Sequence, residues 1–545
     1  MRRSGSRLAA LVAAAVLLAS ACTRAGNGAA GARHPWTQPG VLRIATILSP
    51  NTLNPLISTQ QIEAQIEGMI FDPLVSADEH QRPVPILASV VPTLENGGIS
   101  RDGLTITYHL RHGVKWQDGV PFTSADVAFS VHALMNPNTN ITTRHGYDDI
   151  TRVDTPDPYT AVFHLERPFA PAVNTFFAPS DAPYFIVPAH LLAKYASLNR
   201  VAFNQAPIGT GPFKLARWVR GDELEFVPND AYFGGKPKLQ RIVLRLVPDE
   251  NTAANLTRSH EIDWFMEATP RTYPQLTGID GVRVRLVSMN ANDAILFNTA
   301  RPAFADPRVR RAIGLAIDKQ RLVRDLTYGT TIAATEDLPS FMWAFDPHAG
   351  TAKRDLKAAD ALLNAAGWRR GADGIRVKSG QRFSMGLAYR SDSITDRQRS
   401  VLIASMLHEA GIEVQLKGYT TALLYAGGET GILSGGKYDA GLQTWYAGID
   451  PDDSSEFLCS EVAPKGYDWT RYCDPEMDAA QHTALTHYDE ATRKRAYAQI
   501  QTLLARDAPE VYLWWPRQIE SVNTDFKGFR PNGVIETWNS WEWSI

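Results

Sequence analysis

Serine, histidine and aspartate residues are the first places to look for chemistry in this sequence of 545 residues. Leu433-Ser434-Gly435 lacks the first glycine of a G-x-S-x-G nucleophile turn. His408-Glu409 has no second histidine at the spacing of the zinc-protease motif H-E-x-x-H. The 13 histidines are scattered, and Asp452-Asp453 is more simply a solvated loop than a carboxylate site. We therefore predict no catalytic residues, no metal site and no cofactor, so the protein is not expected to be an enzyme.

Nucleotide and nucleic-acid chemistry is also unsupported. Gly209-Thr210-Gly211 is followed by Lys214 where a dinucleotide fingerprint has glycine, and no Walker A sequence occurs. The net charge of -3 gives no basic footprint for nucleic acid. Apolar residues make up 44% and charged residues 21%, which are ordinary values for a soluble globular chain. Beyond the N-terminus no stretch is long and apolar enough to span a bilayer.

The N-terminus predicts export. A basic region with Arg2, Arg3 and Arg7 precedes an apolar segment at 8–18, and Ala19-Ser20-Ala21-Cys22 supplies small residues before a cysteine. This pattern is similar to the lipobox of bacterial lipoproteins, which implies removal of residues 1–21 and acylation of Cys22. Ordinary signal-peptidase cleavage after Ala21 is the alternative. Residues 22–40 are rich in Gly and Ala and predict a flexible tether. The expected location is outside the cytoplasm, with a lipid anchor in the bacterial membrane, in the periplasm or at the cell surface.

The other two cysteines, Cys459 and Cys473, form an even pair in an oxidising compartment, which predicts a disulfide. Such a bond contributes about 3 kcal/mol by the chain-entropy estimate. Two free buried thiols are the alternative.

Strand and helix patterns alternate along the chain without a fixed repeat, which predicts an α/β protein. Predicted strands are 41–47, 104–110, a short one through Trp116, 213–218, 223–227, 242–247 and 511–515. Predicted helices follow capping signals at Thr123 with Asp126, at Asp306-Pro307 and at Asp355, and a further amphipathic helix contains Ala496, Ile500 and Leu503-Leu504.

Four segments in order resemble the family 5 bacterial extracellular solute-binding proteins, the oligopeptide- and dipeptide-binding receptors of ABC importers. They are LTITYHLRHGVKWQDGVPFTSADVAF at 104–129, GTGPFKLARW at 209–218 with Asn229 and Tyr232, Phe297-Asn298-Thr299 with Phe304 and DPRVRRAIGLAID at 306–318, and AADALLNAAGW at 358–368. Together they span most of residues 41–530. The turns and apolar positions in these motifs are themselves structural.

The resemblance implies a two-lobed periplasmic-binding-protein fold of type II, of the large peptide-binding class, with an extra subdomain. Lobe I is expected at 41–84, 206–293 and 518–545, the inserted subdomain at 85–205 and lobe II at 294–517. It further implies a monomer that captures a peptide or peptide-like small solute between the lobes and delivers it to an ABC permease and ATPase complex. No nucleic-acid partner is expected.

The resemblance also implies where the ligand binds. In relatives a Trp, any residue, a small residue and an Asp follow one another, and the Asp pairs with the ligand's α-amino group. Here Gly448 stands at the Asp position, so either Asp450 or Glu63 supplies the carboxylate, or the ligand has no free amino terminus. A surface helix residue is the alternative for Glu63. The expected ligand-binding residues are Asn54, Gln60, Glu63, Thr444, Trp445, Tyr446, Ala447, Gly448 and Asp450.

Other functions remain open from the sequence. The same fold is compatible with a receptor for a non-peptide solute (a sugar, an opine or a metal chelate), with a sensory or chaperone-like binding protein, and with a secreted enzyme.

Overall fold

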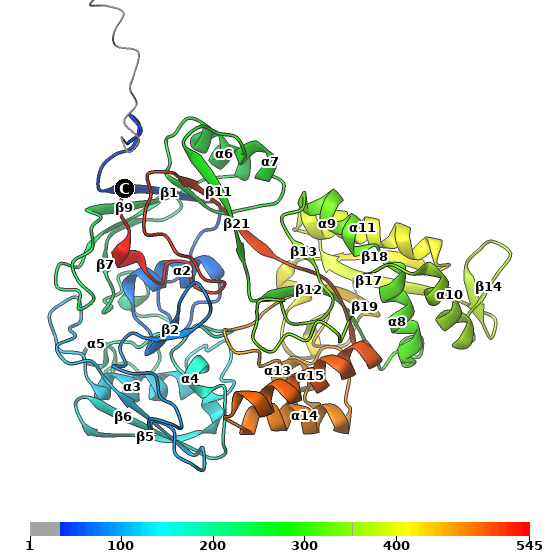
Figure 1. The fold of residues 1–545 in the computed structure, drawn as a ribbon, viewed down its shortest axis with the longest axis horizontal. Coiled ribbons are helices and arrows are strands. Elements are labelled where there is room, and N and C mark those ends of the chain that lie inside the picture. The colour runs from blue at the N-terminus through cyan, green and yellow to red at the C-terminus, as the bar shows by residue number, and fades with distance from the viewer. Residues whose placement is uncertain (1–32, 351–352) are drawn as a thin grey trace, which may run out of the picture. The chain divides into compact units, whose positions relative to one another are not determined.

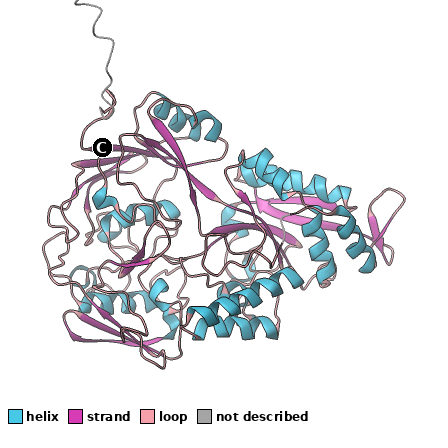
Figure 2. Cartoon of the chain, viewed as in Figure 1, coloured by secondary structure: helices cyan, strands magenta, loops and turns pink. Residues whose placement is uncertain are grey.

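Strand β1 (Val41–Thr46) begins the first large sheet, and its alternating apolar residues Leu42 and Ile44 are fully buried. The computed structural model describes residues 33–350 and 353–545 (Figures 1 and 2). The predicted leader, Cys22 and most of the predicted tether fall at positions 1–32, outside the described residues. β1 pairs in parallel with two strands that are distant in sequence, through Ile44 with Trp264 and with Leu244. The seven strands, in spatial order, are β11 (Val282–Ser288), β21 (Arg517–Asn523), β10 (Trp264–Ala268), β1, β9 (Arg241–Leu246), β8 (Glu223–Pro228) and β7 (Phe213–Val219).

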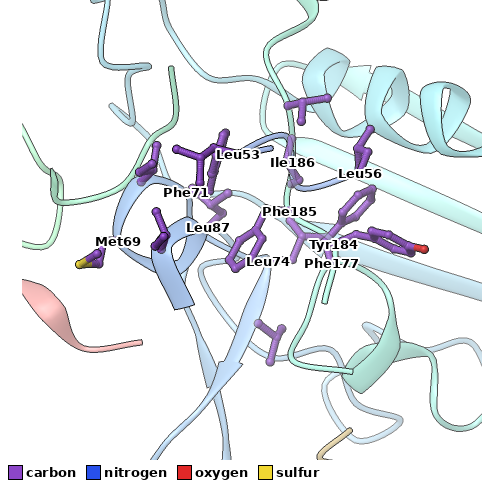
Figure 3. Packing of buried hydrophobic residues seen from close by; sticks show 14 of the residues in the cluster. Leu53, Leu56, Met69, Phe71, Leu74, Leu87, Phe177, Tyr184, Phe185 and Ile186 are labelled. Carbon is purple, nitrogen blue, oxygen red and sulfur yellow. The ribbon is translucent and has the colours of Figure 1, made fainter. Parts of the chain in front are cut away.

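We call this sheet, with the segments packed on it, lobe I. Helix α2 (Gln61–Ile70) buries Ile62, Ile66 and Met69 in a large apolar cluster that also contains residues of β1. Aromatic side chains join the cluster, among them Phe71, Phe177 and Phe185 (Figure 3). Helices α6 (Glu250–Arg258) and α7 (Tyr273–Leu276) follow β9 and β10.

A second sheet of six strands forms the centre of lobe II. In spatial order its strands are β13 (Ile332–Ala333), β20 (Glu510–Trp515), β12 (Ala291–Phe297), β19 (Ala440–Tyr446), β17 (Ser384–Arg390) and β18 (Glu413–Tyr419). Its helices are α8 (Pro307–Ala316), α9 (Lys319–Thr327), α10 (Leu356–Ala365), α11 (Ile394–Glu409), α12 (Thr421–Leu424), α13 (Ser454–Phe457), α14 (Pro475–Thr486) and α15 (Glu490–Asp507). Figure 1 shows α14 and α15 side by side, and Ala480, Ala484, Ala496 and Ile500 pack in one cluster between them. A small sheet of β14 (Arg369–Arg370), β15 (Arg376–Lys378) and β16 (Gln381–Arg382) follows α10.

The predicted inserted subdomain contains a three-stranded sheet and short helices. Its elements are β4 (Thr105–His109), α3 (Ser124–Met135), β5 (Ile150–Asp157), β6 (Thr160–Leu165), α4 (Ala172–Thr175) and α5 (Ala189–Leu192), and the small hairpin β2 (Val75–Ala77) and β3 (Pro83–Pro85) precedes it. Phe163 and Phe176 of this segment belong to the same apolar cluster as Leu42 and Ile44 of lobe I. The segment therefore shares its core with lobe I, and we call it the insert.

Two short connections join the sheets. β11 ends at Ser288 and β12 begins at Ala291, while β20 ends at Trp515 and β21 begins at Arg517. The predicted boundary after residue 293 falls inside β12, whose first residue, Ala291, already pairs with Tyr446 of lobe II. The crossing therefore lies about the residues 289–290 and at Pro516.

Most predicted elements are confirmed, because local capping chemistry marks their ends. Thr123 and Asp126 form a capping box at α3, and the Asp306 and Asp355 side chains cap α8 and α10. The predicted strand through Trp116 is wrong: the segment makes a single bridge, Lys115 with Pro121, around the Asp118-Gly119 turn. Among the described residues, no helix combines the length and the apolar character needed to cross a bilayer.

Candidate ligand-binding site between the lobes

The predicted binding segment 444–450 lies at the end of β19, next to the crossing between the sheets. Tyr446 pairs with Ala291, and the Ala447 N–H donates to the Asn290 carbonyl at 2.7 Å. β19 is an inner strand, but β17 pairs with it only at Ala440 and Gly441. In the ladders of the described strands, residues 442–446 therefore pair on one side only, toward β12, as strand addition by an extended ligand requires.

Four aromatic rings gather beside this segment. The Trp445 ring lies 6.1 Å from Tyr467 and 6.4 Å from Trp469, measured between centroids. Tyr425 lies 5.5 Å from Trp469. Tyr425, Tyr467 and Trp469 line a cavity of about 510 Å³, whose opposite wall comes from the insert at Thr142–Asp149 and Arg167–Phe169. This volume is within the range of small-molecule sites.

Tyr446 is partly exposed to solvent, although protein atoms surround its hydroxyl group. Its side chain is 49% exposed, yet desolvation by the surrounding protein raises the pKa of its hydroxyl to about 12, with Asp293 next in importance. The charge of Glu267 in lobe I also acts on this hydroxyl. Tyr446 is therefore a half-exposed side chain within electrostatic range of acidic groups from both sheets.

A buried network of charges supports this strand from behind. Thr444 Oγ1 donates to Asp293 Oδ1 at 2.8 Å, and Asp293 pairs with the buried guanidinium of Arg399. Arg399 and Arg390 both pair with Asp396, at 2.9 and 2.7 Å. Burial opposes the charge of Arg390, but Asp396 outweighs it and raises the pKa of this guanidinium above its ordinary value. The predicted residue Thr444 thus holds the strand, and the network ends at Arg390, which the sequence did not indicate.

Gly448 fits against the insert because it has no side chain. A Cβ built there lies 2.7 Å from Ser180 Cα, a contact that real Cβ atoms do not make. The Gly448 carbonyl accepts from Asn290 Nδ2 at 2.6 Å, and Ile449 N donates to the Pro179 carbonyl at 3.1 Å. An aspartate at this position, as in peptide-binding relatives, is incompatible with this contact between the lobes.

Asp450 is already neutralised. Its two carboxylate oxygens pair with Arg493 at 2.9 and 2.6 Å, and Asn174 of the insert donates to Oδ2 at 3.4 Å. The pair is buried, and Asp450 raises the pKa of Arg493 against the opposing effect of desolvation. The Asp450 carboxylate is therefore committed to a guanidinium rather than to a ligand amine.

The hydrogen bonds of Glu63 and Asn54 do not support the predicted ligand contacts from the first lobe. Glu63 is fully buried and accepts from four backbone N–H groups, those of Asn51, Thr52, Thr59 and Gln60, at 2.7, 3.1, 2.8 and 3.0 Å. Gln60 caps α2 in the same capping box. Asn54, also fully buried, bonds Asn204 Oδ1 at 2.9 Å. We reassign Asn54 and Glu63 from ligand contact to support of the loop that precedes α2.

One disulfide bond and one ion pair lie beside the cavity. The predicted disulfide between Cys459 and Cys473 is confirmed, and it closes the segment that carries Tyr467 and Trp469. His145 of the insert pairs with Asp452 of lobe II at 3.0 Å. Burial disfavours the charged ring, but Asp452 outweighs this effect and raises the pKa of His145 to about 9.

The described residues contain no group of His, Cys, Asp and Glu able to hold a metal ion.

Several relatives of the chain are named as binding proteins. It is 31% identical to Protein XP55 of Streptomyces lividans over 475 residues, covering 86% of this chain and 82% of that one. It is 25% identical to the oligopeptide-binding protein AppA of Bacillus subtilis over 546 residues, covering 98% and 97%. Among solved structures, NikZ of Campylobacter jejuni in complex with Ni(L-His) superposes with a TM-score of 0.78 at 25% identity, covering 93% of this chain and all of that one.

Residues 83–465, more than half of the chain, match the family described as "Bacterial extracellular solute-binding proteins, family 5 Middle". The chain therefore belongs to the family 5 bacterial extracellular solute-binding proteins.

Proposed function

We propose that this protein is the extracytoplasmic substrate-binding component of an ABC importer, which captures a peptide or peptide-like solute between its lobes and delivers it to the permease. The observation that carries the proposal is the aromatic cavity between the insert and lobe II. It lies beside β19, whose residues 442–446 pair with β12 on one side and with none of the described strands on the other. Kinship with AppA, named as an oligopeptide-binding protein, supports a peptide-like ligand. The protein acts without catalysis and as a monomer.

The ligand binds at 444–450 without a free α-amino anchor. Gly448 has no room for the relatives' aspartate, Asp450 is paired with Arg493, and the Glu63 carboxylate accepts hydrogen bonds from four backbone N–H groups. An unpaired buried ammonium is strongly disfavoured. The ligand is therefore an N-blocked or cyclic peptide, or a non-peptide solute. A metal chelate is the second candidate, supported by the likeness to NikZ in complex with Ni(L-His).

Mass spectrometry of protein purified from its native host under non-denaturing conditions tests the proposal. We expect one small solute at a stoichiometry of one per chain, released on unfolding. A thermal-shift series of N-acetylated, cyclic and free-amino peptides of matched sequence, together with a nickel–histidine chelate, then defines its class. Stabilisation by free-amino peptides alone contradicts the proposed ligand class. Absence of any co-purifying solute and of any shift contradicts the binding function itself.

The anchor at Cys22 is part of the same proposal, since a receptor that feeds a permease works at the membrane surface. Cys22→Ser is expected to release the protein from the membrane fraction. Mass spectrometry of the N-terminal peptide of the wild-type protein should show acyl groups on Cys22, and cleavage after Ala21 with an unmodified cysteine contradicts the anchor.

A further inference from the structure

A second cavity, which shares no lining residue with the aromatic one, lies beside the crossing between the sheets. Its volume is about 460 Å³, within the range of small-molecule sites. The end of β11, which runs beside β21 (Figure 1), forms one wall at Arg285–Ser288. The turn between β2 and β3 at Glu79–Gln81 and the C-terminal segment at Pro531–Gly533 form two further walls. Phe341 of lobe II also lines the cavity, so a solute bound here can contact both lobes.

This cavity adjoins the predicted binding segment. Asn290, at the crossing, donates through Nδ2 to Gln81 Oε1 at 3.2 Å and to the Gly448 carbonyl at 2.6 Å. Gln81 has a left-handed backbone, with φ 63°, which residues other than glycine rarely adopt and which recurs at functional sites. A Cβ built on Gly533 would lie 2.6 Å from the Ser288 carbonyl oxygen, so the C-terminal segment packs tightly against the end of β11. The walls of the cavity are therefore fixed next to the predicted binding segment.

Hydrogen-bond donors dominate the polar part of the lining. Arg285 donates through one nitrogen, to the Phe529 carbonyl at 2.7 Å, and its other N–H groups bond no acceptor among the described residues. Gln81 uses its side-chain carbonyl oxygen, but its side-chain N–H groups have no acceptor in the described part of the chain. The Ser288 hydroxyl bonds none of the described residues either. Unused donors thus come from two walls of one cavity, and such donors recognise an acceptor.

The positive charge of Arg285 is not balanced nearby. This guanidinium is half-buried, and none of the described residues forms an ion pair with it. Two carboxyl groups act on it, but burial raises the pKa of Glu520 to about 7 and that of Glu536 well above its ordinary value, so neither is fully charged at neutral pH. Glu79 of the lining is already paired with Arg530 at 3.3 Å. An anion in the cavity would supply the missing partner.

We propose that this cavity binds a carboxylate of the solute, with Arg285 as its ion-pair partner. The inference rests on the proposed solute-binding function and names the group that anchors a solute without a free α-amino end. A planar carboxylate matches the guanidinium, which offers parallel N–H donors in a fixed fork. Gln81 and Ser288 supply further donors, and the exposed ring of Phe341 packs against the apolar part of the solute.

Titration calorimetry on the full mature chain tests the proposal with N-acetylated peptides of matched sequence, each as the C-terminal free acid and as the C-terminal amide. The free acids are expected to bind at least tenfold more tightly than the amides. Arg285→Gln should reduce this preference below threefold while leaving the affinity for the amides unchanged. Arg285→Lys keeps the charge without the fork and should retain part of the preference. Arg283→Gln removes the same charge from an exposed position of β11 outside the cavity, so this matched control should keep the full preference.

Equal affinity for acids and amides overturns the inference while leaving solute binding intact, and so does a full preference in a folded Arg285→Gln variant. If that variant does not fold, Gln81→Ala and Ser288→Ala each remove one donor and should lower the preference, and an unchanged preference in both overturns the inference. Inorganic phosphate is the probe for a free anion. Stabilisation by phosphate that depends on Arg285, without a preference for the acids, assigns the cavity to a free anion and overturns the solute carboxylate.

Native mass spectrometry supplies an independent measurement. A co-purifying solute that carries a carboxylate and is lost from Arg285→Gln supports the inference, and a solute without a carboxylate overturns it. Failure of every peptide, with no co-purifying solute, contradicts the proposed function and this inference together.

Discussion

His145 and Asp452 form an ion pair that joins the insert to lobe II, with a distance of 3.0 Å between Nε2 and Oδ2. Asp181 of the insert adds a second negative charge near the ring. His145 lines the cavity and Asp452 belongs to lobe II, so the energy of this pair favours contact between the insert and lobe II.

His145→Gln is expected to weaken ligand affinity about tenfold, because a partly buried charged pair is worth roughly 1–3 kcal/mol. The wild-type protein should lose the same affinity above pH 9, as His145 gives up its proton, while the variant should not. Titration calorimetry between pH 7 and 10 checks both statements. Parallel pH profiles for the two proteins contradict the role of the pair.

Gly448→Ala tests the contact with the insert. The added methyl group meets Ser180 Cα at 2.7 Å, so the walls must separate, and we expect ligand affinity to fall at least tenfold with little change in the unfolding temperature of the ligand-free protein. Gly386→Ala in β17 is the control, since the nearest atom to a Cβ there lies 3.4 Å away, an ordinary van der Waals contact, and Gly386 does not line the cavity. Small-angle scattering with saturating ligand should show a larger radius of gyration for Gly448→Ala than for the wild type. Equal affinities for the two alanine variants would rule out the steric explanation.

The substitution Asp450→Asn tests whether the Asp450 carboxylate stabilises the fold or binds the ligand. Removing one partner of a buried ion pair costs about 3–5 kcal/mol, so denaturant unfolding should show a loss of this size. The discrimination between free-amino and N-acetylated peptides should stay unchanged. Asp325→Asn removes an exposed partner of Arg321 and should cost less than about 1 kcal/mol. Loss of binding to free-amino peptides alone in Asp450→Asn contradicts our assignment of this residue.

Removal of the disulfide by replacing Cys459 and Cys473 with serine should lower the free energy of unfolding by about 3 kcal/mol, since the bond closes a short loop. Because this loop carries Tyr467 and Trp469, affinity should fall as well. A peptide map without reductant should show the two cysteines linked in the wild type. Full alkylation of both thiols before reduction contradicts the bond.

Four buried carboxyl groups in lobe II make the stability of the protein depend on pH. Burial raises the pKa of Asp337 to about 7 and that of Glu510 to about 8, and raises those of Asp453 and Glu456 well above their ordinary values. Between about pH 4 and 8 the folded protein therefore binds more protons than the unfolded chain, so stability falls as pH rises through this window. The elevated pKa of His145 acts in the same direction between about pH 6.5 and 9.

We accordingly expect a higher unfolding temperature at pH 5.5 than at pH 8.5, and a smaller difference in Glu510→Gln, which removes one of the buried acids. Calorimetric scans at the two pH values measure it. An unfolding temperature that rises toward pH 8.5 contradicts the assignment.

The sequence predicted what local chemistry decides. Thr123 and Asp126 mark the start of α3 because a capping box needs only residues three positions apart. Glu63 forms a capping box as well, but Gln60 takes the place of the usual Ser or Thr, which hid the motif and left Glu63 open to a ligand role. The contact of Gly448 with Ser180 and the network that ends at Arg390 depend on residues far apart in the chain, and no local pattern reveals them.

The crossings between the sheets are short, with two residues between β11 and β12 and Pro516 alone between β20 and β21. Proline fixes its own φ angle, so this connection has little freedom to stretch or slide. Short crossings of this kind favour rotation of the lobes about an axis through them over sliding along it. Under the proposed function, a bound solute sets the angle between the lobes, and a permease that contacts their outer surfaces would distinguish the loaded receptor from the empty one by that angle, without touching the solute.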